Sequence, residues 1–380
     1  MRRSTRKALV QLSLFFGALF FILFLNHSQS NNKTFAWNQI RYRTPSATLP
    51  EARGICPGLT DASKPALVVA RVAADGDTKW LDELTSLYHL CVYTSDALAD
   101  ATSLHLQVPA NRGHEAMAYL TFLIDNYENI PAAGVVFVHG SRFAWHNDAL
   151  DYDNAALLAA LNVSAALAPF GYHNLRCDWS LSTCPASYEP QGSLEISTQA
   201  LLAPYDSRAV SDAALPRALA DLFGGEAKLG RTNAVRSQCC AQFVVSRDGI
   251  WQHSREEYVA LRQWLLDSNG APHDDRVAGR ILSYVWHILF IKEESDAQGS
   301  SLGGIDLEKL NTQACPRADQ CYCRLYGRCD LKGCTSPGSC PGQYHGPTEG
   351  TKEVEDKMSV LRFWCRYQTQ VMYHETLIRF

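Results

Sequence analysis

Residues 66–94 read ALVVARVAADGDTKWLDELTSLYHLCVYT, and this stretch decides the fold. It begins with Ala66–Arg71 and ends with His89–Thr94, two short apolar runs rich in strand-forming residues, which predict buried strands. Between them, apolar residues recur at helical spacing over 79–87. A strand, a helix and a strand with short joins predict a βαβ unit, so the two strands lie in a parallel sheet.

The chain on either side of this unit continues the same pattern. An amphipathic helix is predicted from residue 115 to 127, and a third buried strand follows at 134–138. Later segments predict a strand over 239–247 and helices over 256–267 and 280–290. We therefore predict an α/β domain over 61–295, built on a mainly parallel sheet that helices flank.

The N-terminus predicts a membrane anchor. Residues 1–7 contain four basic side chains and no acid, and residues 8–25 contain no charge at all. Eighteen helical residues span about 27 Å, close to the thickness of the hydrocarbon core. Because the basic flank stays in the cytosol, we expect a type II protein of a secretory membrane, the Golgi, with a stem over 26–60. A cleaved signal peptide is the alternative, although the sequence FILFLNHSQS offers a poor cleavage site.

The composition agrees with a lumenal location. Asn32 and Asn162 begin glycosylation sequons, and the chain has 13 cysteines, which an oxidising lumen converts to disulfides. Eight of these cysteines are the ones we expect in disulfides: Cys177, Cys184, Cys315, Cys321, Cys323, Cys329, Cys334 and Cys340. Cys177 and Cys184 read as one pair, and the other six fall in a Cys-rich C-terminal appendage (296–350) whose spacing suits zinc poorly. A final helix is expected within 351–380.

The balance of charge excludes one class of partner. The net charge is −4 and the acidic and basic residues are well mixed, without a basic block, so we expect no nucleic-acid partner.

In an open parallel sheet, ligands bind beyond the carboxyl ends of the strands. This rule selects Arg71 and Asp75 after the first strand, Asp96 after the second, and the loop 139–153 after the third. Arg112 and Glu115 join them because they open a helix, whose N-terminus suits a phosphate. The alternatives are turn and cap roles for the aspartates, and an Arg112–Glu115 pair on a solvated face.

The loop after the third strand predicts a metal site. His139, His146 and Asp148 combine imidazole and carboxylate groups, which suit Mn²⁺ or another divalent ion. Asp148 is also a candidate catalytic carboxylate. No Asp-x-Asp stands directly at the strand end, since the motif Asp151-Tyr-Asp153 comes about a dozen residues later.

Long motifs carry a family resemblance. The segments NRGHEAMAYLTFLIDNYENIP, VVFVHGSRFAWHND, GYHNLRCDW, CCAQFVVSRDGI and GRILSYVWHILF resemble a large, mainly fungal family catalogued as a domain of unknown function, over about residues 65–292. More remotely, the order of elements is similar to the GT-A fold of enzymes that use nucleotide sugars. That resemblance implies nucleotide-side roles for Arg71, Asp75, Asp96, Arg112 and Glu115, and a metal motif at the third strand.

The resemblance to this family implies an acid before Tyr-x-Trp-His, a position at which this chain has Ser283. If that acid is a catalytic base, this chain is either impaired or uses Asp274 or Asp275 in its place. The first hypothesis is therefore a Golgi glycosyltransferase that acts on a nucleotide sugar and a glycan or protein acceptor. The second is a non-catalytic lumenal protein that binds glycans or proteins, and the third is a metal-dependent hydrolase.

Overall fold

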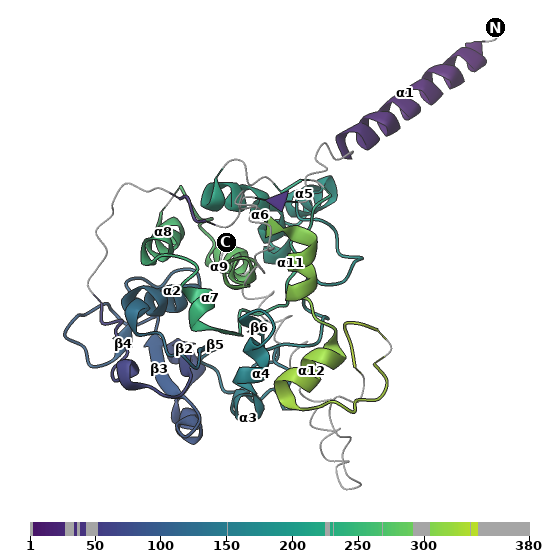
Figure 1. The fold of residues 1–380 in the computed structure, drawn as a ribbon. Helices are drawn as coiled ribbons and strands as arrows, with labels where there is room; N and C mark the ends of the chain where they lie inside the picture. The colour runs from purple at the N-terminus through teal and green to yellow at the C-terminus, as the bar shows by residue number, and fades with distance from the viewer. Residues whose placement is uncertain are drawn as a thin grey trace, which may run out of the picture.

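The computed structural model describes residues 3–26, 34–35, 39–42, 52–149, 151–224, 229–230, 232–267, 269–291, 305–334 and 336–340. Most of the predicted stem, the sequon residue Asn32 and the helix predicted within 351–380 lie outside the described residues. The rest forms an α/β domain on a six-stranded mixed sheet (Figure 1).

The sheet contains the two parallel strands predicted from residues 66–94, but the segment between them is a short 3₁₀ helix, η3 (Lys79–Leu84), and not the α-helix predicted over 79–87. Its strands lie in the order β4-β3-β2-β5-β7-β6. Their bounds are β2 (Ala66–Arg71), β3 (His89–Thr94), β4 (Leu106–Gln107), β5 (Val135–His139), β6 (Tyr172–Asn174) and β7 (Phe243–Val245). Strand β2 pairs in parallel with β3 and β5, and β3 pairs in parallel with β4. Strand β7 runs antiparallel to both β5 and β6, so the sheet is mainly parallel only on its β4–β5 side.

One face of the sheet is covered by helices from the middle and later parts of the chain. Alternate residues of β2, namely Ala66, Val68 and Ala70, belong to this larger core. The helices that contribute to it are α2 (Glu115–Asp125), α6 (Ser207–Phe223), α8 (Arg255–Leu266), α9 (Asp275–Ser283) and α10 (Trp286–Phe290). Figure 1 shows α2, α8 and α9 grouped on this side.

The opposite face carries a second core. Leu67 and Val69 of β2 point into it, together with Val136 and Val138 of β5. The covering elements are η3 (Lys79–Leu84), α3 (Asn154–Ala160), α4 (Val163–Leu167) and α12 (Ala318–Tyr326). Because α12 buries Cys321, Tyr322 and Leu325 here, the cysteine-rich segment that we expected as an appendage is part of the domain core.

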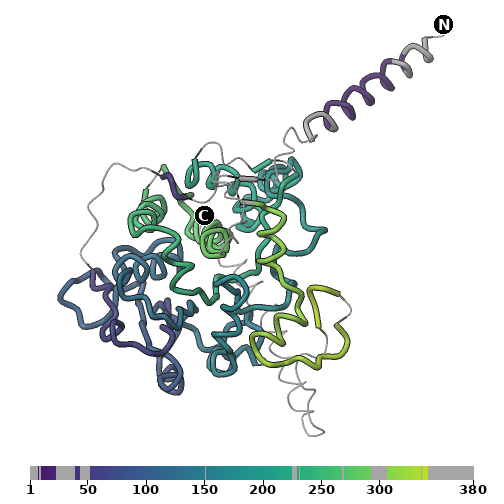
Figure 2. The backbone as a smooth tube through the Cα atoms, viewed as in Figure 1, coloured from purple at the N-terminus to yellow at the C-terminus, as the bar shows by residue number. Residues whose placement is uncertain are grey.

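Disulfides attach this segment to the domain. The eight cysteines expected in disulfides are all paired, but Cys177 and Cys184 do not pair with each other. Cys177 bonds to Cys321 and Cys184 to Cys315, across 144 and 131 residues of chain. Both cysteines therefore hold the C-terminal segment on the middle of the chain, a pairing that spacing alone does not reveal. Figure 2 shows the two parts of the backbone side by side.

The other disulfides are local or link neighbouring elements. Their pairs are Cys56–Cys91, Cys239–Cys240, Cys323–Cys329 and Cys334–Cys340. The remaining short elements are η1 (Leu59–Asp61), η2 (Ala73–Asp75), η4 (Tyr127–Asn129), α5 (Leu194–Leu202), α7 (Arg247–Ile250), α11 (Leu307–Ala314), and the pair β1 (Thr34–Phe35) and β8 (Ile305–Asp306).

The helix predicted over 280–290 is wrong in extent. Helix α9 begins earlier, at Asp275, and ends at Ser283, and α10 begins only at Trp286. Both helices are buried against the larger core, so the apolar run continues across the break and hides it in the sequence. Helix α6 was not predicted, because Pro216 lies inside it and its apolar residues mark no clear face.

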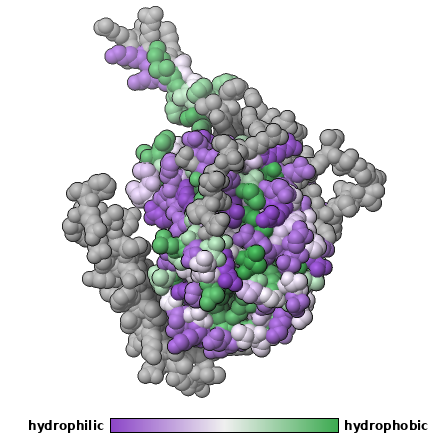
Figure 3. All heavy atoms as spheres, turned by 90° about the vertical axis from the view of Figure 1, so that its left-hand side faces the viewer, coloured by the Kyte–Doolittle hydropathy of each residue, from purple (hydrophilic) through white to green (hydrophobic). Residues whose placement is uncertain are grey.

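Helix α1 (Arg3–Asn26) covers the predicted anchor. The side chains described there, Lys7 and residues 10–22, are all exposed, and the apolar ones include Leu14 and Phe20 at 69% and 71% exposure. Among the residues that the structure describes, no helix combines the length and hydropathy that a membrane crossing requires. In Figure 3, by comparison, hydrophilic residues are spread over the visible face of the α/β domain, with apolar residues among them.

Candidate functional site

A cleft lies at the carboxyl ends of β2 and β5, where the sheet rule predicts a ligand. Its volume is about 550 Å³. We call it the strand-end cleft. Its lining includes Arg71, Asp75, Ser95, Asn111, Glu115, His139, Ser141, Trp145, His146 and Asp275. The structure therefore brings together residues that follow three different strands and one that opens α2.

The loop after β2 forms one wall of this cleft. Asp75 accepts hydrogen bonds from Ser141 Oγ (2.6 Å) and from the Val72 N–H (2.9 Å). Asp96 accepts one from the Ala73 N–H (2.8 Å) and does not line the cleft. Both carboxylates therefore order the loop after β2, which is the turn-and-cap role given above as the alternative. Asp75 also lines the strand-end cleft.

Arg71 is the cation of this wall. One terminal nitrogen of its guanidinium donates to the carbonyl of Gly76 (3.0 Å). Its Nε is buried and has no hydrogen-bond partner among the described residues. Gly140 lets the ends of β2 and β5 approach, because a Cβ there would lie 2.7 Å from the Arg71 Cα.

The start of α2 turns Glu115 toward the cleft. Gly113 and His114, which precede the helix, both have positive φ, 68° and 55°. A side chain on Gly113 would meet Leu265, with Cδ1 at 2.6 Å, so only glycine fits this turn against α8. His114 adopts an unfavourable conformation for a residue with a Cβ, which marks this turn as a constrained part of the site.

Glu115 and two histidines form the most strongly perturbed group of the site. Glu115 Oε2 lies 4.0 Å from His139 Nε2, and the rings of His139 and His146 lie edge to face with centroids 4.9 Å apart. Burial raises the pKa of Glu115, although nearby positive charge opposes the shift. Burial lowers the pKa of His139 to about 4 and of His146 to about 3. At neutral pH both imidazoles are uncharged, and the raised pKa of Glu115 suits a group that exchanges a proton during catalysis.

Asp148 does not join these histidines. It is 2% exposed, accepts hydrogen bonds from the N–H groups of Cys177 and Asp178, and lies 3.6 Å from the guanidinium of Arg176. In the described chain, three metal-binding side chains converge only at Cys56, His89 and Cys91, where the cysteines form a disulfide. The positions of His139, His146 and Asp148 therefore do not fit the predicted Mn²⁺ site. Asp148 instead holds the loop 139–153 against the backbone of Cys177 and Asp178.

The residues expected to bind phosphate at α2 are already paired. Arg112 forms an ion pair with Asp275 and donates to the carbonyl of Pro272. Asp275 also accepts from the Gly113 N–H (3.1 Å), so a carboxylate of the protein occupies the helix start. Asp274 caps α9 and pairs with Arg276 (3.0 Å). Ser283 donates to the carbonyl of Arg280 (2.6 Å).

A second cleft of about 470 Å³ adjoins the strand-end cleft at Glu115. We call it the α9 cleft. It shares His114, Glu115, His139, Trp145 and His146 with the strand-end cleft. Its own lining includes Leu181, Arg208, Cys239, Cys240, Arg276, Gly279, Arg280 and Ser283. Sequence reasoning missed Arg208 and the Cys239–Cys240 disulfide as site residues, although two adjacent cysteines at the start of the strand predicted over 239–247 were a visible signal.

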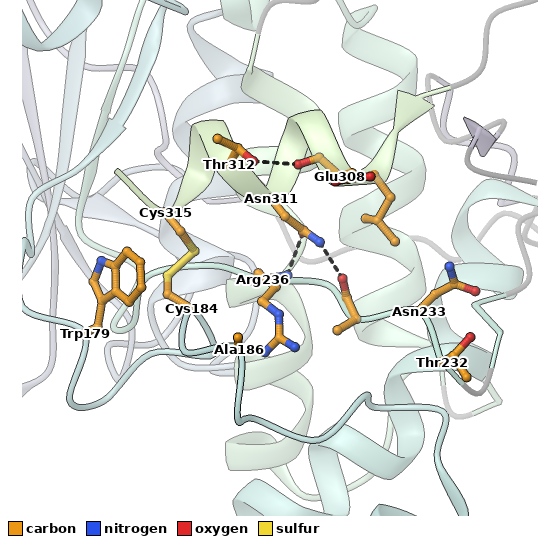
Figure 4. Close-up of a pocket in the computed structure, with 12 residues that line it drawn as sticks. Trp179, Cys184, Ala186, Thr232, Asn233, Arg236, Glu308, Asn311, Thr312 and Cys315 are labelled. Carbon is orange, nitrogen blue, oxygen red and sulfur yellow. Dashed lines mark hydrogen bonds between the residues drawn. A yellow bond between two sulfur atoms is a disulfide. The ribbon is translucent and has the colours of Figure 1, made fainter. Parts of the chain in front are cut away.

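A further cavity, about 560 Å³, lies elsewhere (Figure 4). The Cys184–Cys315 disulfide and α11 form its wall, and Asn311 exchanges hydrogen bonds with the Arg236 N–H (2.8 Å) and the Ala234 carbonyl (2.7 Å). The guanidinium of Arg236 donates to three backbone carbonyls. The polar groups of this cavity hold α11 against residues 234–236, so we assign the cavity a structural role.

Asn162, the sequon residue within the described chain, is exposed at the N-terminus of α4. Its side-chain oxygen caps the helix by accepting from the Ala165 N–H (3.0 Å). Glycosylation there stays a prediction.

Comparison with known proteins gives one match. A family model described as "Protein of unknown function (DUF3431)" matches residues 67–324, from β2 into α12. The match includes both clefts and the disulfides of Cys177 and Cys184. No curated protein and no solved structure matches the chain.

Proposed function

The chain belongs to this family of proteins of unknown function, and we propose that it is a type II Golgi membrane protein with a GT-A-type glycosyltransferase domain. In this proposal the lumenal domain transfers a sugar from a nucleotide sugar to a glycan or protein acceptor. The observation that carries it is the strand-end cleft, where Arg71, Asp75 and Ser95 lie opposite Glu115 and His139.

The succession of elements supports the same proposal. Strands β2 and β3, helix α2, strand β5 and the late strand β7 follow the order on which the GT-A resemblance rests. The nucleotide would lie along the ends of β2 and β3, next to Arg71 and Ser95. Its diphosphate would face Arg71, because Arg112 is already paired with Asp275.

The proposed reaction joins an acceptor hydroxyl oxygen to the anomeric carbon of the donor sugar. The bond from that carbon to the diphosphate oxygen breaks, and its electron pair leaves with the nucleoside diphosphate. The acceptor proton goes to Glu115, whose carboxylate lies between the two clefts and whose pKa burial raises. His139 is uncharged at neutral pH, so the permanent positive charge that acts on the Glu115 carboxylate comes from Arg280. No step uses a metal, since the predicted ligands do not converge.

The experiment is nucleotide binding and turnover by the full-length protein in detergent. UDP, GDP and their sugar conjugates are titrated while the melting temperature and the release of nucleoside diphosphate are measured. Glu115→Gln is expected to keep nucleotide binding and to lose about 10²–10⁴-fold in turnover. Glu256→Gln, which changes an exposed carboxylate outside both clefts, is the matched control. If no nucleotide raises the melting temperature, the transferase proposal is wrong.

The membrane topology is tested separately. The uncharged run at 8–25 and the exposed apolar side chains of α1 support an anchor, and exposed Asn162 is the reporter. A lumenal domain predicts that endoglycosidase treatment shifts the wild-type band, and that Asn162→Gln reduces the shift. Carbonate extraction should leave the protein in the membrane. Release by carbonate would favour the cleaved signal peptide instead.

A specific observation favours the non-catalytic alternative. Asp148, Arg112 and Asp275, all candidates for chemistry, are held in structural pairs, and Ser283 stands where the family resemblance implies an acid. A binding protein would retain glycan affinity without releasing nucleotide, which the same titrations distinguish.

A further inference from the structure

We propose that the α9 cleft binds the acidic group of a sugar acceptor, so that the acceptor is an acidic glycan such as a uronic-acid-bearing chain. This inference rests on the proposed function for the assignment of the donor to one cleft and the acceptor to the other. The acidic character of the ligand, however, follows from the residues of the α9 cleft alone.

The charge of the α9 cleft differs from that of its neighbour. Three arginines, Arg208, Arg276 and Arg280, line it, and Glu115 is the carboxylate among its lining residues. The strand-end cleft has Arg71 as its arginine and three carboxylates, Asp75, Glu115 and Asp275. Because the two clefts meet at Glu115, a ligand that spans both meets positive charge on the α9 side.

Arg280 is the cation best placed to bind an anion. It is half-buried on α9, and its positive charge acts on the carboxylates of Glu115 and Asp212 without a direct ion pair to either among the described residues. Arg276 differs, since it already pairs with Asp274 (3.0 Å). A half-buried guanidinium with unused N–H groups binds a carboxylate with two parallel hydrogen bonds, an arrangement that a neutral sugar cannot reproduce.

Arg208 extends the cationic wall. It stacks over the ring of Tyr188 (4.5 Å) and donates to the carbonyl of Ser182 (3.1 Å), which holds the side chain in place. Its buried Nε has no partner among the described residues. The nearest buried acid, Asp212, is 1% exposed and accepts from the hydroxyls of Tyr188 and Tyr284. Asp212 therefore balances part of the charge from behind, while the arginines keep donors for a ligand.

The apolar part of the cleft suits a sugar ring. Trp145 is 63% exposed and lines both clefts, so one face of an acceptor ring can pack on the indole next to Glu115. The Cys239–Cys240 disulfide and Leu181 line the same cleft. The acceptor is placed here because the strand ends that suit the nucleotide lie in the adjoining strand-end cleft.

The test compares two ligands that differ in one group, p-nitrophenyl glucuronide and p-nitrophenyl glucoside. Each is titrated into full-length protein in detergent, with and without UDP. We expect wild-type protein to bind the glucuronide at least about 10-fold more tightly than the glucoside. Hydrogen bonds from Arg280 to the charged carboxylate should supply the binding free energy for this difference. Arg280→Gln should remove this preference and leave glucoside and UDP affinities unchanged, and Arg280→Lys should retain part of it. Arg217→Gln, which removes an exposed arginine of α6, is the matched control.

Two results would overturn the inference. One is equal affinity of the wild type for glucuronide and glucoside. The other is a loss of UDP affinity in Arg280→Gln with glucuronide affinity intact, which would assign the cation to the nucleotide. Absence of UDP binding in the wild type would instead overturn the proposed function, while a glucuronide preference that depends on Arg280 would still support an acidic-sugar site. Unchanged melting temperatures of the variants exclude misfolding as the cause.

Discussion

Replacing Asp148 separates a structural role from the metal-binding role that its sequence context predicts. The side chain is 2% exposed and accepts from two backbone N–H groups, and its partner Arg176 is 11% exposed. Asp148→Ala leaves two backbone N–H groups without their acceptor and Arg176 with Asp178 (3.3 Å) as its counter-charge, a change that costs about 2–5 kcal/mol. Asp148→Asn keeps one acceptor oxygen and loses the charge, so we expect about 1–3 kcal/mol.

The assay is guanidinium unfolding of the full-length protein in detergent, with disulfides intact, followed by tryptophan fluorescence. Total stabilities of about 5–15 kcal/mol make a loss of this size a clear shift of the midpoint. Asp330→Asn, which changes an exposed carboxylate, serves as the control and should stay within about 0.5 kcal/mol of wild type. Nucleotide affinity of Asp148→Asn should match that of the wild type.

A different pattern would refute this reasoning. If Asp148→Asn kept the wild-type midpoint and abolished a Mn²⁺-dependent rise in melting temperature, Asp148 would be a metal ligand. The arrangement of residues 146–148 in solution would then differ from the one described here.

Three further predictions concern the core of the domain. Burial lowers the pKa of His287 to about 3, so below about pH 6.5 the unfolded chain binds a proton that the folded chain does not. The free energy of unfolding therefore falls by up to about 1.4 kcal/mol for each pH unit. In His287→Gln, the free energy of unfolding should depend less steeply on pH over this range. Removing the Cys177–Cys321 disulfide alone should cost about 2–3 kcal/mol in the same unfolding assay, because Cys184–Cys315 still closes nearly the same loop, and removing both should cost more than the sum of the single losses. Gly140→Ala should destabilise by about 1–3 kcal/mol, since its Cβ would press on Arg71, and unchanged stability would show that the strand ends are less closely packed.

The sequence predicted the sheet better than it predicted the site. Strands β2 and β5 are buried apolar runs, as predicted, whereas β3 is only partly buried. The rule for strand ends placed Arg71, Asp75 and His139 together, and all three line the strand-end cleft. The antiparallel direction of β7 was not readable, because Phe243–Val245 is apolar whichever way it runs. The pairing of Cys177 with Cys321 likewise depends on how α12 packs on the second face of the sheet.

The errors at the site share one physical cause. Sequence adjacency placed Asp148 beside His146, but the loop turns between them and directs the carboxylate to the N–H groups of Cys177 and Asp178. Adjacency also left Arg112 beside Glu115, whereas Arg112 pairs with Asp275, more than 160 residues later. A charged side chain is available to a ligand only if it is not already paired within the protein. Such pairs form between residues distant in sequence, so a single motif does not predict them.

The occupied start of α2 has a consequence for where a ligand's charge can lie. A helix N-terminus with Gly113 is suited to a phosphate, but Asp275 already accepts from that N–H and pairs with Arg112. A diphosphate at this position would meet a carboxylate, so it must lie nearer Arg71, at the end of β2. In the proposed complex the anomeric carbon would then point toward Glu115 and the α9 cleft, where the guanidinium of Arg280 begins the proposed acceptor side. Asp275→Asn would remove this repulsion, so it should tighten nucleotide binding even as it weakens the α2–α9 contact, and weaker nucleotide binding would show that the diphosphate does not approach α2.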